Sequence, residues 1–366
     1  MIKSLNSFRA IAFFVVFLFH IHLLGCGYLG VQAFFVLSGF LITPILVNMK
    51  SKMNFKKYWI NFMGRRFLRI FPIYYLLLII LFVLGYFIDY KQIPFAASFY
   101  HQFIYAVTYS YNFINSTDSY ERNSLIAHLW SLAVEEQFYI VWPFFIFLIA
   151  LSKLRKWLLY IIFIGPVIRA IMSLLIYYGF FAGVISPQKM TLAVYVLPFS
   201  YFDAFAIGGY FSLFVNKEIR IRWIFILSAF VVGLGLAINY FIQGKLDLRD
   251  LSGLGYLPVM DEAYKYIWGY TAFNLIFALI LYKMKKREFF PSIFENNILD
   301  YFGKISYGLY LYHFPVIALV CYFLNTTVIS IHVSAMCLVA TVAVSMISYH
   351  FIELRILSFK DKLFPR

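Results

Sequence analysis

The sequence predicts an all-α fold, a polytopic membrane bundle of about ten transmembrane helices. Hydrophobic residues make up 63% of the 366 residues, and charged residues only 13%. Apolar runs of about twenty residues recur from end to end, separated by short breaks that are basic or rich in Gly, Asn or Pro. A soluble domain with so few charges could not cover that many apolar helices, and the runs lack the alternation of barrel strands.

Ten apolar stretches are long enough to be membrane spans. They cover residues 7–24, 30–48, 71–88, 129–151, 157–178, 194–214, 223–242, 265–282, 305–324 and 331–352. An even number of crossings places both termini on one side of the membrane. No internal repeat or low-complexity linker divides the chain, so residues 1–366 are interpreted as a single transmembrane domain.

The basic residues determine the expected orientation. They cluster on the side of the termini, at residues 50–69, 153–156, 217–222, 283–287 and 355–366. The opposite loops hold few basic residues and about as many acidic ones. By the positive-inside rule both termini are cytoplasmic, and the net charge of +15 follows from this topology without a nucleic-acid partner.

The first apolar stretch carries two ionisable residues on one helical face. It lacks a small-residue cleavage site, so we interpret it as a retained span and not as a signal peptide. Arg9 and His20 lie eleven residues apart, which returns them to within about 20° of one face and separates them by about 16 Å. Arg9 would then lie near one membrane surface and His20 well inside, where an ionisable side chain indicates function. His22 faces roughly the opposite way.

The segment at residues 50–69 is basic and rich in aromatic side chains. One interpretation is an interfacial amphipathic helix on anionic lipid. The other is a phosphate site, because Arg65, Arg66 and Arg69 cluster there. Arg66 and Arg69 are one helical turn apart, and paired guanidinium groups bind phosphate well. The two interpretations are compatible.

A segment of about forty residues, 89–128, follows the third expected span on the outer side. It is rich in Tyr, Phe, Asn and Ser, and connections of this length are uncommon unless they have a function. Its aromatic residues are consistent with an interfacial belt or with a platform on which sugar rings stack.

The fourth expected span begins with a polar stripe. His128, Ser131, Glu135 and Tyr139 recur at steps of three, four and four residues, so they share one face of an otherwise apolar helix, whereas Glu136 points about 100° away. A buried carboxylate can be a structural link between helices. A carboxylate aligned with Ser, His and Tyr side chains also suits acid and base chemistry.

Five ordered segments carry a family resemblance: residues 9–20, 30–43, 65–72, 130–143 and 302–316. Together they resemble the acyltransferase 3 family of integral-membrane acyltransferases, over nearly the whole chain. The resemblance implies transfer of an acyl group, usually acetyl from cytoplasmic acetyl-CoA, to a hydroxyl of a bacterial cell-surface polysaccharide or lipid-linked glycan. It also implies the cytoplasmic (inner) membrane as location, and no metal. Capsule, O-antigen, exopolysaccharide and glycolipid acceptors all remain open, as does a longer acyl donor.

The resemblance gives functional weight to seven residues. By expected role they are catalytic His20 and Glu135, acetyl-CoA-binding Arg9, Arg66 and Arg69, and substrate-binding Ser131 and Tyr139. His20 would take the proton of the acceptor hydroxyl while Glu135 orients the imidazole. An acetyl-histidine intermediate is the alternative to direct transfer.

Some positions depart from the family pattern. Gln32 stands where many relatives have an acidic residue, and Tyr201 stands two residues before Asp203, where arginine is frequent. Glu353 is followed by Leu354 and Arg355, whereas the family pattern is Glu-x-Pro, so Glu353 receives no role. The roles of Asp203 and His313 also stay open. No serine motif of a second, SGNH-type domain follows the last span, so a stand-alone form is expected.

The leading alternative from another class is a multi-pass transporter or flippase for a glycan or small solute. Intramembrane Glu, Asp, His and Arg residues also mark transport pathways, but a transporter predicts inverted repeats, and none is visible. A phospholipid acyltransferase merely tethered to the membrane would need a His-x4-Asp motif, which the sequence lacks. The three cysteines have neither metal-ligand spacing nor the even number of a disulfide framework.

Overall fold

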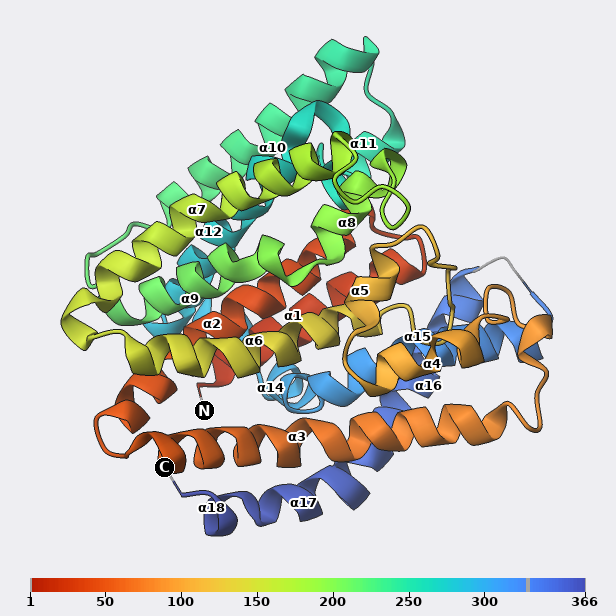
Figure 1. The fold of residues 1–366 in the computed structure, drawn as a ribbon, viewed down its shortest axis with the longest axis horizontal. Helices are drawn as coiled ribbons and strands as arrows, with labels where there is room; N and C mark the ends of the chain where they lie inside the picture. Colours follow the sequence, from red (N-terminus) through yellow and green to blue (C-terminus); the bar gives the residue numbers. More distant parts are fainter. Residues whose placement is uncertain (1, 327–329, 366) are drawn as a thin grey trace. The chain divides into compact units, whose positions relative to one another are not determined.

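The computed structural model describes residues 2–326 and 330–365, and the regular elements over those residues are all helical (Figure 1). Within that part of the chain, eight helices are long and apolar enough to cross a membrane, or nine if a bent pair counts as one span. The all-α membrane bundle is therefore confirmed, with one or two fewer such helices than the ten expected. Helix α1 (Lys3–His20) is not among them, and its 18 residues include Lys3, Arg9 and His20.

The long helices follow the expected order along the chain. They are α2 (Leu29–Lys50), α3 (Phe55–Leu84), α6 (Leu129–Leu148), α7 (Leu151–Tyr177), α10 (Arg222–Gln243), α12 (Lys265–Lys285), α15 (Ser306–Phe323) and α16 (Ile331–Ser348). The expected span at residues 194–214 is instead the bent pair, in which Pro187–Val196 and Pro198–Phe214 meet at 53°. Proline lacks a backbone N–H, so the break at Pro198 leaves one helical hydrogen bond unmade. Helix α16 continues through a π-turn at Tyr349–Glu353 into α17 (Leu354–Ser358) and α18 (Lys360–Leu363).

Helix α3 corrects the expected boundaries of the third span. The basic segment does not form a separate interfacial helix before a span at residues 71–88, because α3 is continuous from Phe55 to Leu84. The Asn54 side chain starts it by accepting a hydrogen bond from the Lys57 backbone N–H, at 3.0 Å. Arg66 and Arg69 therefore lie inside a membrane-length helix.

The connection at residues 89–128 is largely folded. It contains α4 (Phe99–Val107) and α5 (Tyr111–Asn115), and α5 lies beside α6 (Figure 1). The Tyr111 hydroxyl donates to Gln102 Oε1 at 2.6 Å, and Gln102 Nε2 donates to the Glu121 carbonyl at 2.7 Å. These bonds hold the two short helices in a fixed arrangement.

Contacts divide the chain into two compact units, each of which is described by itself. Unit 1 comprises Met1–Ile45, Ser116–Asp118 and Ile149–Lys304, and unit 2 comprises Leu46–Asn115, Ser119–Leu148 and Ile305–Arg366. The interpretation of residues 1–366 as one transmembrane domain stays a prediction.

Unit 1 is held together by a close approach of α2 and α9 (Phe202–Phe214). A Cβ atom on Gly39 would lie 2.1 Å from the Phe205 carbonyl oxygen, and one on Gly208 would lie 2.1 Å from the Val36 carbonyl oxygen. The two backbones thus touch directly, which is how small residues pack helices together in membranes.

Replacing Gly39 with valine is expected to destabilise unit 1 by about 1–3 kcal/mol or more, since the new side chain must push two backbones apart. The measurement is thermal unfolding of the purified protein in detergent. Gly233→Val is the matched control, because a Cβ atom at Gly233 in α10 meets nothing within 4 Å. Equal melting temperatures for the two variants would contradict the close packing.

Candidate functional site

The polar stripe on α6 lies in unit 2, and its members make hydrogen bonds along one face. The Tyr139 hydroxyl donates to Glu135 Oε1, one turn earlier, as the spacing predicts. Ser131 Oγ lies 3.0 Å from the carbonyl oxygen of His128, to which it donates, and 2.5 Å from the Tyr310 hydroxyl of α15. Ser131 and Tyr139 are buried, and Glu135 is partly buried.

The two predicted phosphate-binding arginines of α3 lie next to this stripe. The Arg66 guanidinium lies 5.2 Å from the centroid of the Tyr139 ring and 5.6 Å from that of Phe62. Arg69 is within electrostatic range of Glu135, Tyr139 and Arg66. Four of the seven expected site residues therefore form one cluster of two guanidinium groups, a carboxylate and a phenol.

Arg65, the third arginine of the motif, has a structural role. It donates to Asp361 Oδ1 at 2.6 Å and to the Phe364 carbonyl at 2.6 Å, so it joins α3 to the segment around α18. The proposed phosphate site is thereby reduced to Arg66 and Arg69.

Helix α15 brings in two residues whose part in the site the sequence could not establish. The His313 ring centroid lies 5.2 Å from that of His128, and Tyr310 bonds Ser131 as described above. His128 Nε2 lies 3.0 Å from the Leu311 carbonyl oxygen, and His313 Nδ1 lies 2.6 Å from that of Tyr310. Both imidazoles are buried, and they extend the polar cluster from α6 to α15.

Glu353, for which the sequence predicts no role, also belongs to unit 2. It is buried in the π-turn after α16, where Ser348 Oγ donates to its Oε1 at 3.3 Å. It is within electrostatic range of Arg69. Arg69 is thus placed near two carboxylates that come from different helices.

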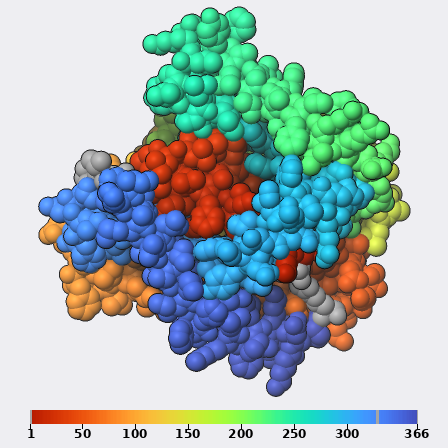
Figure 2. Space-filling view, turned by 180° about the vertical axis from the view of Figure 1, so that it is seen from behind, coloured from red at the N-terminus to blue at the C-terminus, as the bar shows by residue number. Residues whose placement is uncertain are grey.

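Arg9 and His20 lie in unit 1, both in the continuous helix α1 as expected. Arg9 Nη1 donates to Asn6 Oδ1 at 3.1 Å, and Asn6 Nδ2 donates to Asp300 Oδ1 at 2.8 Å. Burial opposes the charge of Asp300, but hydrogen bonds from Lys304 and Asn6 hold the pKa of this carboxyl below its usual value. Figure 2 shows part of the N-terminal segment, in red, beside later segments of unit 1. The pairing of His20 with Glu135 stays a prediction.

A buried ion pair in unit 1 supplies the partner of Asp203 that the sequence left open. Arg169 Nη2 of α7 lies 3.0 Å from Asp203 Oδ2, and both side chains are fully buried. Arg169 also donates to the carbonyls of Ser200 and Ile267 at 2.6 and 2.9 Å, and Thr271 Oγ1 donates to Asp203 at 2.5 Å. Sequence reasoning missed Arg169, although a lone charge within an apolar span was the available signal.

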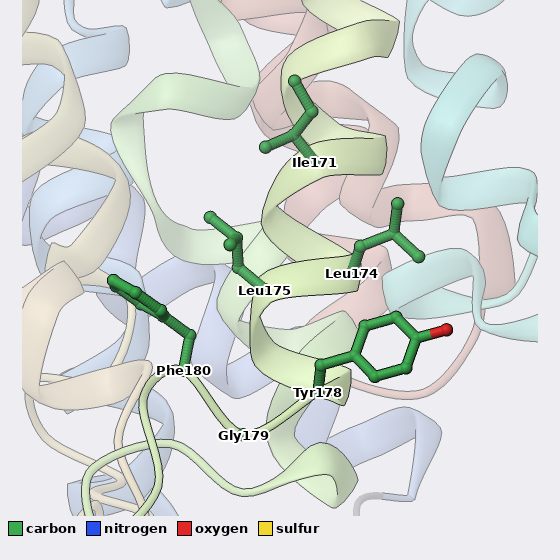
Figure 3. Close-up of a pocket in the computed structure, with 6 residues that line it drawn as sticks. All are labelled: Ile171, Leu174, Leu175, Tyr178, Gly179 and Phe180. Carbon is green, nitrogen blue, oxygen red and sulfur yellow. The ribbon is translucent and has the colours of Figure 1, made fainter.

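The open apolar pocket in Figure 3 is not a candidate for chemistry. It has a volume of about 390 Å³ and is lined by residues from the end of α7, namely Ile171, Leu174, Leu175, Tyr178, Gly179 and Phe180. Its one polar side chain is a tyrosine. Over the described residues, no group of three His, Cys, Asp or Glu side chains could hold a metal ion.

The fold and the buried polar clusters define a multi-pass membrane protein with ionisable groups inside its helical units. A family model described as an acyltransferase domain, acyltransferase 3, matches residues 2–350. The chain therefore belongs to the acyltransferase 3 family.

Two curated relatives are O-acetyltransferases. The peptidoglycan O-acetyltransferase OatA of Listeria monocytogenes is 27% identical over 365 residues, which are 96% of this chain and 55% of that protein. The O-acetyltransferase OatA of Staphylococcus aureus is 27% identical over 376 residues, with 96% and 56% covered. The chain thus spans about half the length of the curated relatives it matches. No solved structure matches it.

Proposed function

We propose that the protein is a membrane O-acetyltransferase of the bacterial cytoplasmic membrane. It would move an acetyl group from cytoplasmic acetyl-CoA to a hydroxyl of a cell-surface polysaccharide or lipid-linked glycan on the outer side. The observation that carries this proposal is the cluster of Arg66, Arg69, Glu135 and Tyr139 inside a membrane unit of a family member. The names of the two relatives support O-acetylation, and that of the Listeria protein specifies a glycan, peptidoglycan, as its acceptor.

The donor would be held by its phosphates. Arg66 and Arg69 offer two planar guanidinium groups one helical turn apart, which suit paired hydrogen bonds to phosphate oxygens. Arg9 would add a third cation at its end of α1. The distance of about 16 Å along α1 from Arg9 to His20 fits the reach of an extended pantetheine arm, so the thioester would lie near His20.

The reaction would be a general-base-assisted acyl transfer. His20 takes the proton of the acceptor hydroxyl as its oxygen forms a bond to the thioester carbonyl carbon. Ser131 and Tyr139 would turn their hydroxyl protons from the His128 carbonyl and from Glu135 to the oxyanion or the substrate, and Glu135 would then stabilise the imidazolium. The C–S bond then breaks, and the proton passes from His20 to the thiolate of CoA. Attack by His20 itself, with a second transfer to the glycan, is the two-step form of the same proposal.

The test uses the purified protein in liposomes with radiolabelled acetyl-CoA and a lipid-linked glycan fraction. We expect His20→Ala to lower label transfer by roughly 10²–10⁴-fold, the usual contribution of a general base. His22→Ala is the matched control, because His22 is exposed and follows the end of the same helix. Transfer that survives His20→Ala would overturn the catalytic role. If the native protein neither binds nor consumes acetyl-CoA, a transporter is favoured instead.

A further inference from the structure

Glu136 is a buried carboxyl that the proposed donor chemistry does not use. It follows Glu135 on α6, is 5% exposed, and points about 100° away from its neighbour. Among the described residues its Oε1 atom has no hydrogen-bond partner. A buried carboxyl oxygen without a donor is costly, so its presence inside a membrane helix indicates a ligand or a function.

The hydroxyls of four tyrosines are within electrostatic range of the Glu136 carboxyl, namely Tyr74, Tyr75, Tyr109 and Tyr307. Glu135 and Arg66 are also within its range. Tyr74 and Tyr75 donate to the carbonyls of Ala106 and Val107 at 2.8 and 3.0 Å. The Tyr109 hydroxyl is buried and, over the described part of the chain, has no hydrogen-bond partner. A carboxyl oxygen of Glu136 and the phenol of Tyr109 thus both lack a hydrogen-bond partner within the same group of tyrosines.

The backbone of Tyr109 is strained, and neighbouring residues hold it in place. It follows α4 with φ +52°, at a position where helices usually end in glycine. Its ring stacks on Tyr74, with centroids 4.3 Å apart, and its carbonyl accepts a hydrogen bond from Gln137 Nε2 at 3.0 Å. Gln137 also exchanges two side-chain hydrogen bonds with Asn112 of α5. Gln137, the residue next to Glu136, therefore anchors the 89–128 connection to α6 and keeps the Tyr109 hydroxyl within electrostatic range of Glu136. Tyr109 is held in this way although its backbone conformation favours glycine.

We propose that Glu136 and Tyr109 bind the acceptor, a neutral sugar that carries free hydroxyls. A carboxylate accepts hydrogen bonds from sugar hydroxyls, a phenol can donate or accept, and aromatic rings pack against the apolar face of a sugar ring. Glu136 lies about 10 Å along α6 from its first residue, at the end that receives the 89–128 connection. This inference rests on the proposed function and deepens it, since it places the acceptor next to Arg66, one of the two proposed donor-binding arginines.

The experiment separates acceptor binding from donor binding. Glu136→Gln and Tyr109→Phe are compared with the native protein in two assays. The first is the Kd for acetyl-CoA of the purified full chain in nanodiscs. The second is the ester-linked acetate that mild alkali releases from the envelope glycans of expressing cells. We expect a Kd within twofold of native, with acetate at least tenfold lower for Glu136→Gln and severalfold lower for Tyr109→Phe. Tyr100→Phe is the control, because Tyr100 lies in the same connection and its exposed hydroxyl bonds the Phe82 carbonyl.

Tyr109→Phe guards against a trivial loss of fold. Phenylalanine keeps the ring that stacks on Tyr74 and removes only the hydroxyl, so this variant should melt close to the native protein and still lose acetate transfer. Native acetate levels in Glu136→Gln or Tyr109→Phe would overturn the inference, as would a parallel loss of acetyl-CoA binding. A native chain that neither binds acetyl-CoA nor adds ester-linked acetate would instead overturn the proposed function, whatever the variants do.

Discussion

Replacing Arg169 with methionine is expected to lower the free energy of unfolding by about 3–5 kcal/mol, because it leaves Asp203 as an uncompensated buried charge. The guanidinium links three parts of unit 1 through Asp203, the Ser200 carbonyl and the Ile267 carbonyl. Denaturant titration of the purified protein in mixed micelles measures the change.

Two controls distinguish the charge effect from the loss of packing. The double variant Arg169→Met with Asp203→Asn removes both charges and should recover part of the loss, which gives the coupling between the two residues. Arg249→Met removes the arginine of an exposed pair, with Asp247 at 3.2 Å, and should change stability by less than about 1 kcal/mol. A similar loss in Arg169→Met and Arg249→Met would contradict a structural ion pair.

Replacing Glu135 with glutamine is expected to lower kcat for acetyl transfer by roughly 10²–10⁴-fold, since it removes a charge and keeps the shape of the side chain. The KM for acetyl-CoA should stay the same or fall, because the carboxylate no longer competes with the phosphates of the donor for Arg69. Initial rates at varied acetyl-CoA concentration separate the two constants.

Arg69→Gln serves as the comparison, because it is expected to change KM for acetyl-CoA in the direction opposite to Glu135→Gln. Its KM for acetyl-CoA should rise, since one of the two adjacent guanidinium groups is lost. Glu121→Gln, an exposed change in the same unit, should leave both constants within twofold. A Glu135→Gln enzyme with more than a tenth of the native kcat would rule out a direct part in the chemistry.

Much of the fold could be predicted because apolar length and the positions of breaks report directly on membrane helices. The spans at residues 129–151, 223–242 and 305–324 differ from α6, α10 and α15 by at most three residues at either end. The start of α3 at Phe55 was missed because a separate basic amphipathic helix and the first turns of a membrane-spanning helix have the same helical periodicity. The bend at Pro198 was missed because proline within an apolar run either kinks a helix or ends it.

Only those contacts of the site that lie within a single helix could be predicted from the sequence. The spacing of Glu135 and Tyr139 predicted their contact, because both lie on α6. The contacts of Arg66 with Tyr139, and of Ser131 with Tyr310, depend on how α3 and α15 pack against α6, which no local pattern encodes. The pairing of Arg169 with Asp203 could not be predicted for the same reason, since the two residues lie 34 positions apart in the chain.

The uninterrupted course of α3 has a consequence for the lipid around it. From Arg69 to the end of the helix at Leu84 the chain rises only about 22 Å, less than the roughly 30 Å of hydrocarbon in a typical bilayer. The guanidinium groups of Arg66 and Arg69 are thus held at a depth where lipid tails would ordinarily surround them. We expect the hydrocarbon layer to thin locally at this helix, so that water reaches the two arginines from the nearer membrane surface.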